Sequence, residues 1–258
     1  MTVCFVKQYG VLCMVAADTR LSIDVGGTEL ARQDIGDLTV NDQFGNTLVV
    51  PYKYRKIRPV GRGWAASAGT FITGSHMLDA LQAAQAFEPE LAVRTIRAAT
   101  PAYVAEFAQA NGDAIYTAPI MGVAVADNGE GAWLAELHPE TGYSLTQTGD
   151  FFSNWPKSIP DLFQPSFDTF SEALENAKNI GDAVRAAAAF IGAARACPGC
   201  GPHVQIGFTV HENPDKFRMG YIEGAVDDII EMSTEVIRSK IENPQERPVR
   251  QDVPHSTI

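Results

Sequence analysis

Short apolar blocks dominate the start of the chain, and their composition is that of β-strands. Residues 2–9 and 11–18 are rich in β-branched and other apolar side chains, and Gly10 separates them. We therefore predict a hairpin whose second strand ends at Asp18. Residues 24–50 break this pattern because they are rich in Gly, Asp and Asn and show little periodicity, so a long insertion is expected there.

Helical and strand patterns alternate along the rest of the chain. Apolar spacing predicts helices over 70–87 and 89–112, and Pro101 should kink or break the second of them. A longer helix is expected over 168–196, with an interruption near Gly181. The remaining expectations are strands at 52–60, 63–69, 113–127, 131–139, 143–148, 203–212 and 217–224, an ordered loop at 154–167 and a last helix at 225–241.

This order of elements predicts an α+β fold. Blocks of strands that alternate with helices favour two stacked antiparallel sheets with helices on both outer faces, a four-layer αββα sandwich. No composition shift marks a linker, so we expect one domain over 1–242, with 24–50 as an insertion in it. The Pro-rich, charged segment 243–258 is expected to be a disordered tail.

Composition narrows the classes of partner. Hydrophobic residues make up 45% of the chain and charged residues 20%, which is typical of a globular protein. The formal net charge of −11 argues against nucleic-acid and anionic-membrane partners, which need basic surfaces. The apolar N-terminal stretch is interrupted by Lys7, Gln8 and Gly10, so it fits a hairpin better than a signal peptide, and we expect a cytoplasmic protein without a membrane span.

The first residues can form a catalytic device. Removal of Met1 would place a hydroxyl and a free α-amine together on Thr2, and an α-amine with a pKa of about 7.7–8.0 can take the hydroxyl proton. Such a site also needs a cation and a carboxylate that holds it. Asp18 ends the return strand of the hairpin, and the next lysines after Lys7 are Lys53 and Lys56, of which only one can face Thr2.

Three segments carry a resemblance to a known family: TVCFVKQYGVLCMVAADTR, YRKIRPVGRGWAASAGT and GPHVQIGFTVHENPDKFRMGYIEG. They resemble the proteasome β-subunits and their bacterial relatives, which are N-terminal-nucleophile (Ntn) hydrolases. The resemblance implies that Thr2 is nucleophile and base, Asp18 the orienting carboxylate and Lys56 the catalytic lysine. It also implies an oxyanion-hole N–H from Gly69, with Ser67 beside it in the substrate region.

The same resemblance implies partners and cofactors. Peptide or protein is the implied substrate, a homo-oligomeric ring the implied assembly, and no cofactor or metal is required. Three alternatives remain open: a proteasome-type peptidase, an amidase or transpeptidase that acts on one defined substrate, and a catalytically silent ring or scaffold subunit. Family likeness alone does not separate them.

Two places depart from the family pattern. Where the family has an Asp-x-x-Ser-Gly turn that supports the N-terminal amine, this chain has Cys197-Pro-Gly-Cys200-Gly201. The family's Ser-Gly pair before the long helix has its nearest counterpart at Thr148-Gly149-Asp150. The core triad is thus retained while its supporting residues change.

The cysteine pair has three interpretations. A zinc half-site would need a second ligand pair, and only His203 is near. A thioredoxin-type motif needs a strand followed by a helix, which is the reverse of the order here. A turn that lines the active site fits best, with a reversible disulfide as an addition. The histidines His76, His138, His203, His211 and His255 show no metal spacing, and Gly26-Gly27 forms no phosphate-binding pattern.

Overall fold

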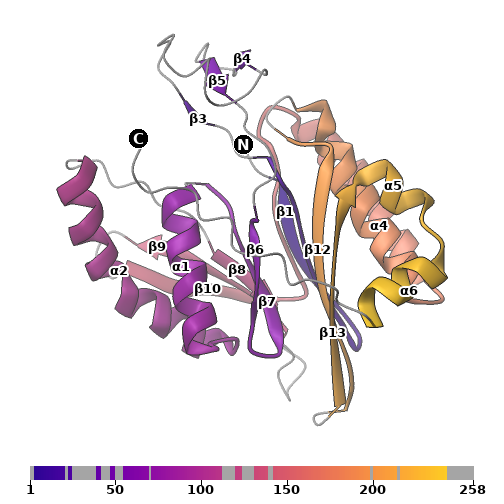
Figure 1. Cartoon of the computed structure of the whole chain (residues 1–258), viewed down its shortest axis with the longest axis horizontal. Helices are drawn as coiled ribbons and strands as arrows, with labels where there is room; N and C mark the ends of the chain where they lie inside the picture. The colour runs from indigo at the N-terminus through magenta and orange to yellow at the C-terminus, as the bar shows by residue number, and fades with distance from the viewer. Residues whose placement is uncertain are drawn as a thin grey trace.

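Two five-stranded antiparallel sheets stack face to face in the part of the chain that the structure describes, and helices cover their outer faces (Figure 1). The predicted α+β sandwich of four layers is therefore confirmed. The structure is a computed structural model, and it describes residues 3–20, 23–24, 39–41, 47–49, 55–69, 71–111, 120–123, 131–138, 142–197, 200–213 and 216–242.

Each sheet is built from strands that are distant in sequence. The first sheet has the order β11 (Phe151–Asn154), β1 (Cys4–Tyr9), β2 (Leu12–Asp18), β12 (His203–Asn213) and β13 (Lys216–Ala225). The second has the order β10 (Gly142–Gly149), β9 (Ala132–His138), β8 (Ile120–Val123), β7 (Gly63–Ser67) and β6 (Ile57–Val60). Within the predicted insertion, the described strands β3 (Ile23–Asp24), β5 (Thr47–Val49) and β4 (Thr39–Asn41) pair in a small separate sheet.

The helices divide between the two faces. Helices α1 (Phe71–Ala84) and α2 (Pro89–Asn111) cover the second sheet, and α3 (Phe163–Glu175) and α4 (Ile180–Ala193) cover the first. Short helices η2 (Pro160–Leu162) and η3 (Ala194–Ala196) flank that pair, and α5 (Val226–Glu231) and α6 (Thr234–Glu242) follow β13. Among the described helices, none has both the length and the apolar character that crossing a bilayer requires.

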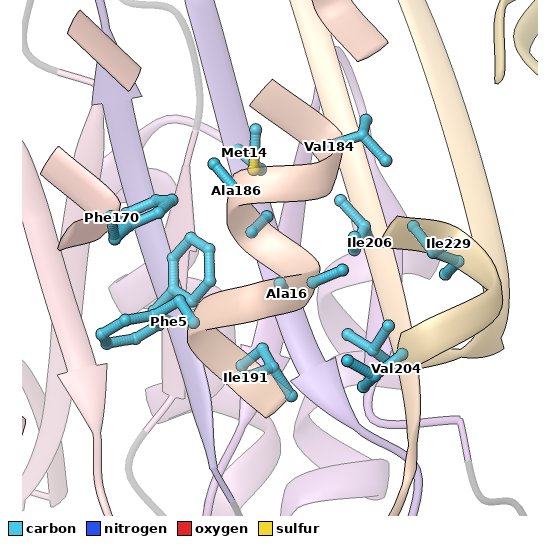
Figure 2. Packing of buried hydrophobic residues seen from close by; sticks show 14 of the residues in the cluster. Phe5, Met14, Ala16, Phe170, Val184, Ala186, Ile191, Val204, Ile206 and Ile229 are labelled. Atoms are coloured by element: carbon cyan, nitrogen blue, oxygen red, sulfur yellow. The ribbon is translucent and has the colours of Figure 1, made fainter. Parts of the chain in front are cut away.

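Hydrophobic residues fill three layers between these elements. Along β1 the side chains alternate, so that Cys4 and Val6 enter the layer between the sheets while Phe5 enters the layer beneath α3 and α4. Figure 2 shows this second layer, in which α4 lies over the strands and Ile191 and Ile206 belong to one buried cluster. Both faces of β2 and of the first half of β1 are buried, which explains why the sequence of these segments is almost continuously apolar.

Trp64 joins the two sheets. From β7 in the second sheet, its indole N–H donates to the carbonyl of Phe208 in the first at 3.1 Å, and its ring stacks on Tyr221 with centroids 5.9 Å apart. A Cβ atom on Gly207 would lie 2.4 Å from Trp64 Cδ2. Glycine at 207 is therefore required for the indole to lie against β12.

Several elements differ from the sequence expectation. Strand β11 pairs with β1 where no strand was expected. Helix α3 begins at Phe163, inside the expected loop, because Pro160 and Pro165 occupy the first turns of η2 and α3, where a missing N–H costs little. Helix α2 continues through Pro101.

The expected interruption of the long helix near Gly181 is present, because α3 ends at Glu175 and α4 begins at Ile180. The long helix ends before Asn179, whose side chain accepts the Asp182 N–H at 3.1 Å and caps α4. Gly181 lies inside α4, where a Cβ would come within 2.9 Å of Thr234 Oγ1, so this glycine serves close packing. The expected last helix is divided into α5 and α6.

His211 is buried at the end of the sandwich farthest along β12 from Asp18. Its side chain is 5% exposed, and its ring stacks on Phe217 with centroids 5.7 Å apart. Neither imidazole nitrogen makes a hydrogen bond of good geometry with the described residues, although the Arg62 backbone lies near. Burial, reinforced by the positive charge of Arg62, lowers the pKa of His211 below its usual value.

We expect His211 to make the protein less stable in acid. A histidine whose pKa is lower in the folded state must bind its proton on unfolding, so its contribution is intact above the unfolded pKa of about 6.5 and is lost as pH falls below it. In that window the free energy of unfolding should fall by up to about 1.4 kcal/mol per pH unit more in the wild type than in His211→Phe. Urea titrations of both proteins between pH 8 and pH 5 measure the difference, and parallel curves would contradict this account.

Candidate active site

The topology brings Asp18 to the start of β1. Asp18 is the last residue of β2 and pairs with Val204 of β12, while the β1–β2 register places Cys4 opposite Ala17. One step further along the hairpin, the Asp18 N–H donates to the carbonyl of Val3 at 3.0 Å. The residue that follows Thr2 is thus fixed to the backbone of Asp18.

The Asp18 carboxylate accepts four hydrogen bonds. Oδ1 accepts from Val3 N at 3.0 Å and from Lys56 Nζ at 2.8 Å. Oδ2 accepts from Arg20 N at 3.0 Å and from Gly201 N at 3.2 Å. The side chain has no exposed surface, and a carboxylate so buried needs such a full set of donors. Asp18 is therefore the point at which the hairpin, Lys56 and the segment after η3 meet.

Lys56 forms a buried ion pair with Asp18. It stands immediately before β6, and its side chain is 5% exposed while that of Asp18 is 0% exposed. The two residues come from different sheets, so the sandwich must assemble before they meet. A lysine withdrawn from water in this way is stabilised by its carboxylate partner, and breaking such a pair is costly. Lys53, the alternative from the sequence, lies outside the described residues.

A tight turn joins β7 to α1 beside this pair. Ser67, the half-buried last residue of β7, donates its N–H to the carbonyl of Lys56 at 3.4 Å. Gly69 is exposed and has a φ of +79°, which favours glycine because a Cβ atom is strained there. Helix α1 begins two residues later, at Phe71, so the predicted oxyanion residue lies just before a helix N-terminus.

The cysteine turn also reaches Asp18. The Cys200 N–H donates to the carbonyl of Cys197 at 2.9 Å, and the next N–H, of Gly201, is one of the four donors to Asp18. The Arg20 guanidinium donates to the carbonyl of Cys200 at 3.2 Å and ties the turn to the end of the hairpin. These contacts place the turn beside Asp18, while the predicted contact of the turn with the Thr2 amine lies outside the described residues.

Neither turn thiol is in a disulfide, and both are buried. Burial raises the pKa of Cys200 well above its usual range, and the negative charge of Asp18 adds to this. The hydroxyl of Ser158 donates to Cys197 Sγ at 3.3 Å. Near the same pair, burial raises the pKa of Cys4 to about 12. Cys4 and Cys200 are therefore neutral thiols at neutral pH.

The nearest counterpart of the family's Ser-Gly pair lies away from Asp18. Gly149 and Asp150 lie beside the other end of β1, where Asp150 accepts a hydrogen bond from Lys7 Nζ at 2.8 Å. That end is about 10 Å along the strand from Cys4. The β1–β11 register instead places Asn154 opposite Cys4, so the segment after β11, which includes Ser158, approaches the site. The short strand β11 carried no clear sequence signal.

Thr2 lies outside the described residues, and the site is built up to its neighbour Val3. Of the histidines that the structure describes, only His203 lies at this end, where its carbonyl accepts the Thr19 N–H at 3.2 Å. His76 packs against Tyr103, and the side chain of His138 and all of His255 lie outside the described residues. Within the described part of the chain, no three His, Cys, Asp or Glu side chains gather in a way that could hold a metal ion.

Comparison with known proteins supports the fold. No protein-family model matches the chain, and no curated protein matches it. Among solved structures, it is similar to a Gly-1 mutant of Anbu from Hyphomicrobium sp. strain MC1, with a TM-score of 0.51 and 13% sequence identity over 96% of this chain and 100% of that one. Anbu is a bacterial, proteasome-like Ntn hydrolase. At this identity the likeness concerns the fold, and the chain has an α+β sandwich of the Ntn-hydrolase type.

Proposed function

We propose that this chain is an N-terminal threonine hydrolase that cleaves amide bonds through an acyl-enzyme on Thr2. The observation that carries the proposal is the buried Lys56–Asp18 pair, 2.8 Å apart, whose Oδ1 atom also holds the N–H of Val3. The charged pair therefore lies at the residue next to the proposed nucleophile.

The reaction follows from these groups. The α-amine of Thr2 takes the proton of its own hydroxyl, and Oγ1 attacks the carbonyl carbon of the amide. Lys56 favours the neutral amine and the developing alkoxide, and Asp18 fixes Lys56. The N–H of Gly69 stabilises the oxyanion, and the position of Gly69 just before the N-terminus of α1 suits this role. The intermediate expels the amine, which takes the proton from the Thr2 ammonium, and water then hydrolyses the ester.

Peptide is the proposed substrate class. We propose that residues 1–242 fold as one domain and that the chain assembles into a homo-oligomeric ring in the cytoplasm. A catalytically silent subunit is the second candidate, and the thiols at Cys197 and Cys200 favour it. Thiols accept hydrogen bonds weakly, so they would hold the Thr2 amine less firmly than a carboxylate and a hydroxyl. A panel of fluorogenic peptides tests the choice. The wild type should hydrolyse at least one of them and Thr2→Ala none, whereas equal rates would favour the silent subunit.

The proposal requires that Thr2 be the first residue of the working protein. While Met1 is attached, the nitrogen of Thr2 is an amide and cannot act as a base. We therefore expect purified, active protein to begin at Thr2. N-terminal sequencing measures this directly, and active material that retains Met1 would exclude the mechanism.

Replacing Cys200 by serine should not lower the activity. A hydroxyl at this position accepts and donates stronger hydrogen bonds than a thiol, so the amine would be better oriented. The Cys200→Ser variant should be at least as active as the wild type and insensitive to reductant. Rates of reaction with a threonine-directed β-lactone, with and without reductant, measure this, and equal rates in all four conditions would mean that the cysteines only fill space.

A further inference from the structure

The strand pairing of the second sheet holds the backbone of Lys56 only in part. Strand β6 is at the edge of that sheet, paired only with β7 among the described strands, and Lys56 lies just outside its first residue. The carbonyl of Lys56 still accepts from Ser67 N, at the long distance of 3.4 Å. Its N–H leaves the strand pairing, so the sheet alone does not fix this residue.

The lost backbone partner is replaced by a side chain from the first sheet. Gln205 of β12 accepts the Lys56 N–H through Oε1 at 2.9 Å. Gln205 is 1% exposed, although a glutamine is rarely so buried, and the bond gives it a specific role. Its cross-strand neighbour in β2 is Ala17, the residue before Asp18. One strand thus holds the backbone of Lys56 next to the carboxylate that its ammonium binds.

A second contact holds the residue before Lys56. The guanidinium of Arg55 lies over the ring of Tyr221, 5.2 Å from its centroid, and the Tyr221 hydroxyl donates to Glu223 Oε2 at 2.7 Å. Glu223 is the cross-strand partner of Gln205, so the two side chains lie on the same face of the β12–β13 hairpin. The β12–β13 hairpin therefore contacts two successive residues, Arg55 through Tyr221 and Lys56 through Gln205.

We infer that Gln205 is a positioning residue for Lys56, which it holds through the Lys56 backbone rather than through its ammonium group. The catalytic consequence rests on the proposed function, but the positioning itself does not. A displacement of about 1 Å in a catalytic group can cost about a hundredfold in rate, so the loss of this bond should be visible in catalysis. Because the Gln205 side chain is uncharged, it adds no second negative charge beside Lys56. Asp18 therefore remains the carboxylate that pairs with the Lys56 ammonium group.

Two substitutions separate position from charge. Gln205→Met removes the acceptor and nearly keeps the volume, while Gln205→Glu keeps an acceptor and adds a negative charge. Thr209→Val is the matched control, because Thr209 is buried on the same face of β12 and is far from Asp18. Hydrogen exchange of the Lys56 amide, measured by NMR on labelled protein, reports the position, and β-lactone acylation of Thr2 between pH 6 and pH 10 reports catalysis.

In Gln205→Met we expect the Lys56 amide to exchange faster and acylation to slow by about tenfold to a hundredfold. In Gln205→Glu the amide should stay protected, and the pH profile should move to higher pH, because a nearby carboxylate favours the protonated forms of Lys56 and the amine. Thr209→Val should match the wild type in both measurements. An unchanged exchange rate in Gln205→Met would overturn the positioning, and an unchanged acylation rate would overturn its catalytic role. A wild type that forms no Thr2 adduct refutes the proposed function, while the exchange result still decides the positioning.

Discussion

Lys56→Ala is expected to abolish measurable acylation of Thr2. The lysine supplies the charge that keeps the Thr2 amine neutral, and losing such assistance to proton transfer costs about 10²- to 10⁴-fold in rate. Because Lys56 is buried against Asp18, no water-exposed lysine can take its place. Acylation by a β-lactone, followed by intact mass spectrometry, measures the rate.

Lys53→Ala is the control for Lys56→Ala, because Lys53 is the other lysine that the sequence places near this strand. It should be mild. A urea titration of both variants separates lost chemistry from lost folding. If Lys53→Ala removed acylation and Lys56→Ala did not, Lys56 would be only the partner of a structural ion pair.

The second large effect is expected from Asp18→Asn, in stability as well as in chemistry. An asparagine at 18 keeps one oxygen and turns the other into a donor, so at least one of the N–H groups of Val3, Arg20 and Gly201 or the Lys56 ammonium faces another donor. It also leaves the charge of Lys56 buried and unpaired. Breaking a buried pair from one side costs about 3–5 kcal/mol.

Asp150→Asn is the matched control, since Asp150 pairs with Lys7 at the same 2.8 Å but with a side chain that is 78% exposed. Exposed pairs contribute about 0–1 kcal/mol, so this variant should unfold almost as the wild type does. Urea denaturation of both variants measures the difference. Equal losses would mean that burial gives the Asp18 pair no special importance.

Local patterns were sufficient to predict the sandwich. The hairpin that ends at Asp18 and the strands around 57–67 have strong apolar patterns, and the structure has them where they were expected. Strand β11 was missed because four residues with half-buried faces carry little periodicity. The start of α3 was missed because prolines suit both loops and first turns.

The candidate site could be predicted only in part, for a physical reason. The hairpin pattern places Asp18 at a strand end, while Lys56 was expected inside a strand and was selected over Lys53 only by the family resemblance. Gln205 acts through a single amide oxygen, and no pattern in β12 predicts it. Gly201 was expected in the supporting turn, but its N–H contact with Asp18 was not. The Gln205 contact spans 149 residues and follows from the stacking of the two sheets, and the Gly201 contact spans 183 residues and follows from the pairing of β12 with β2.

The central claim is that Thr2, as an N-terminal residue, is the nucleophile. The most direct test is to treat the purified protein with a threonine-directed β-lactone and to map the adduct by peptide mass spectrometry. The account predicts one adduct per chain, located on Thr2 of a chain that lacks Met1, and none in Thr2→Ala. A wild type that remains unmodified at Thr2 although it is folded and lacks Met1 would contradict it.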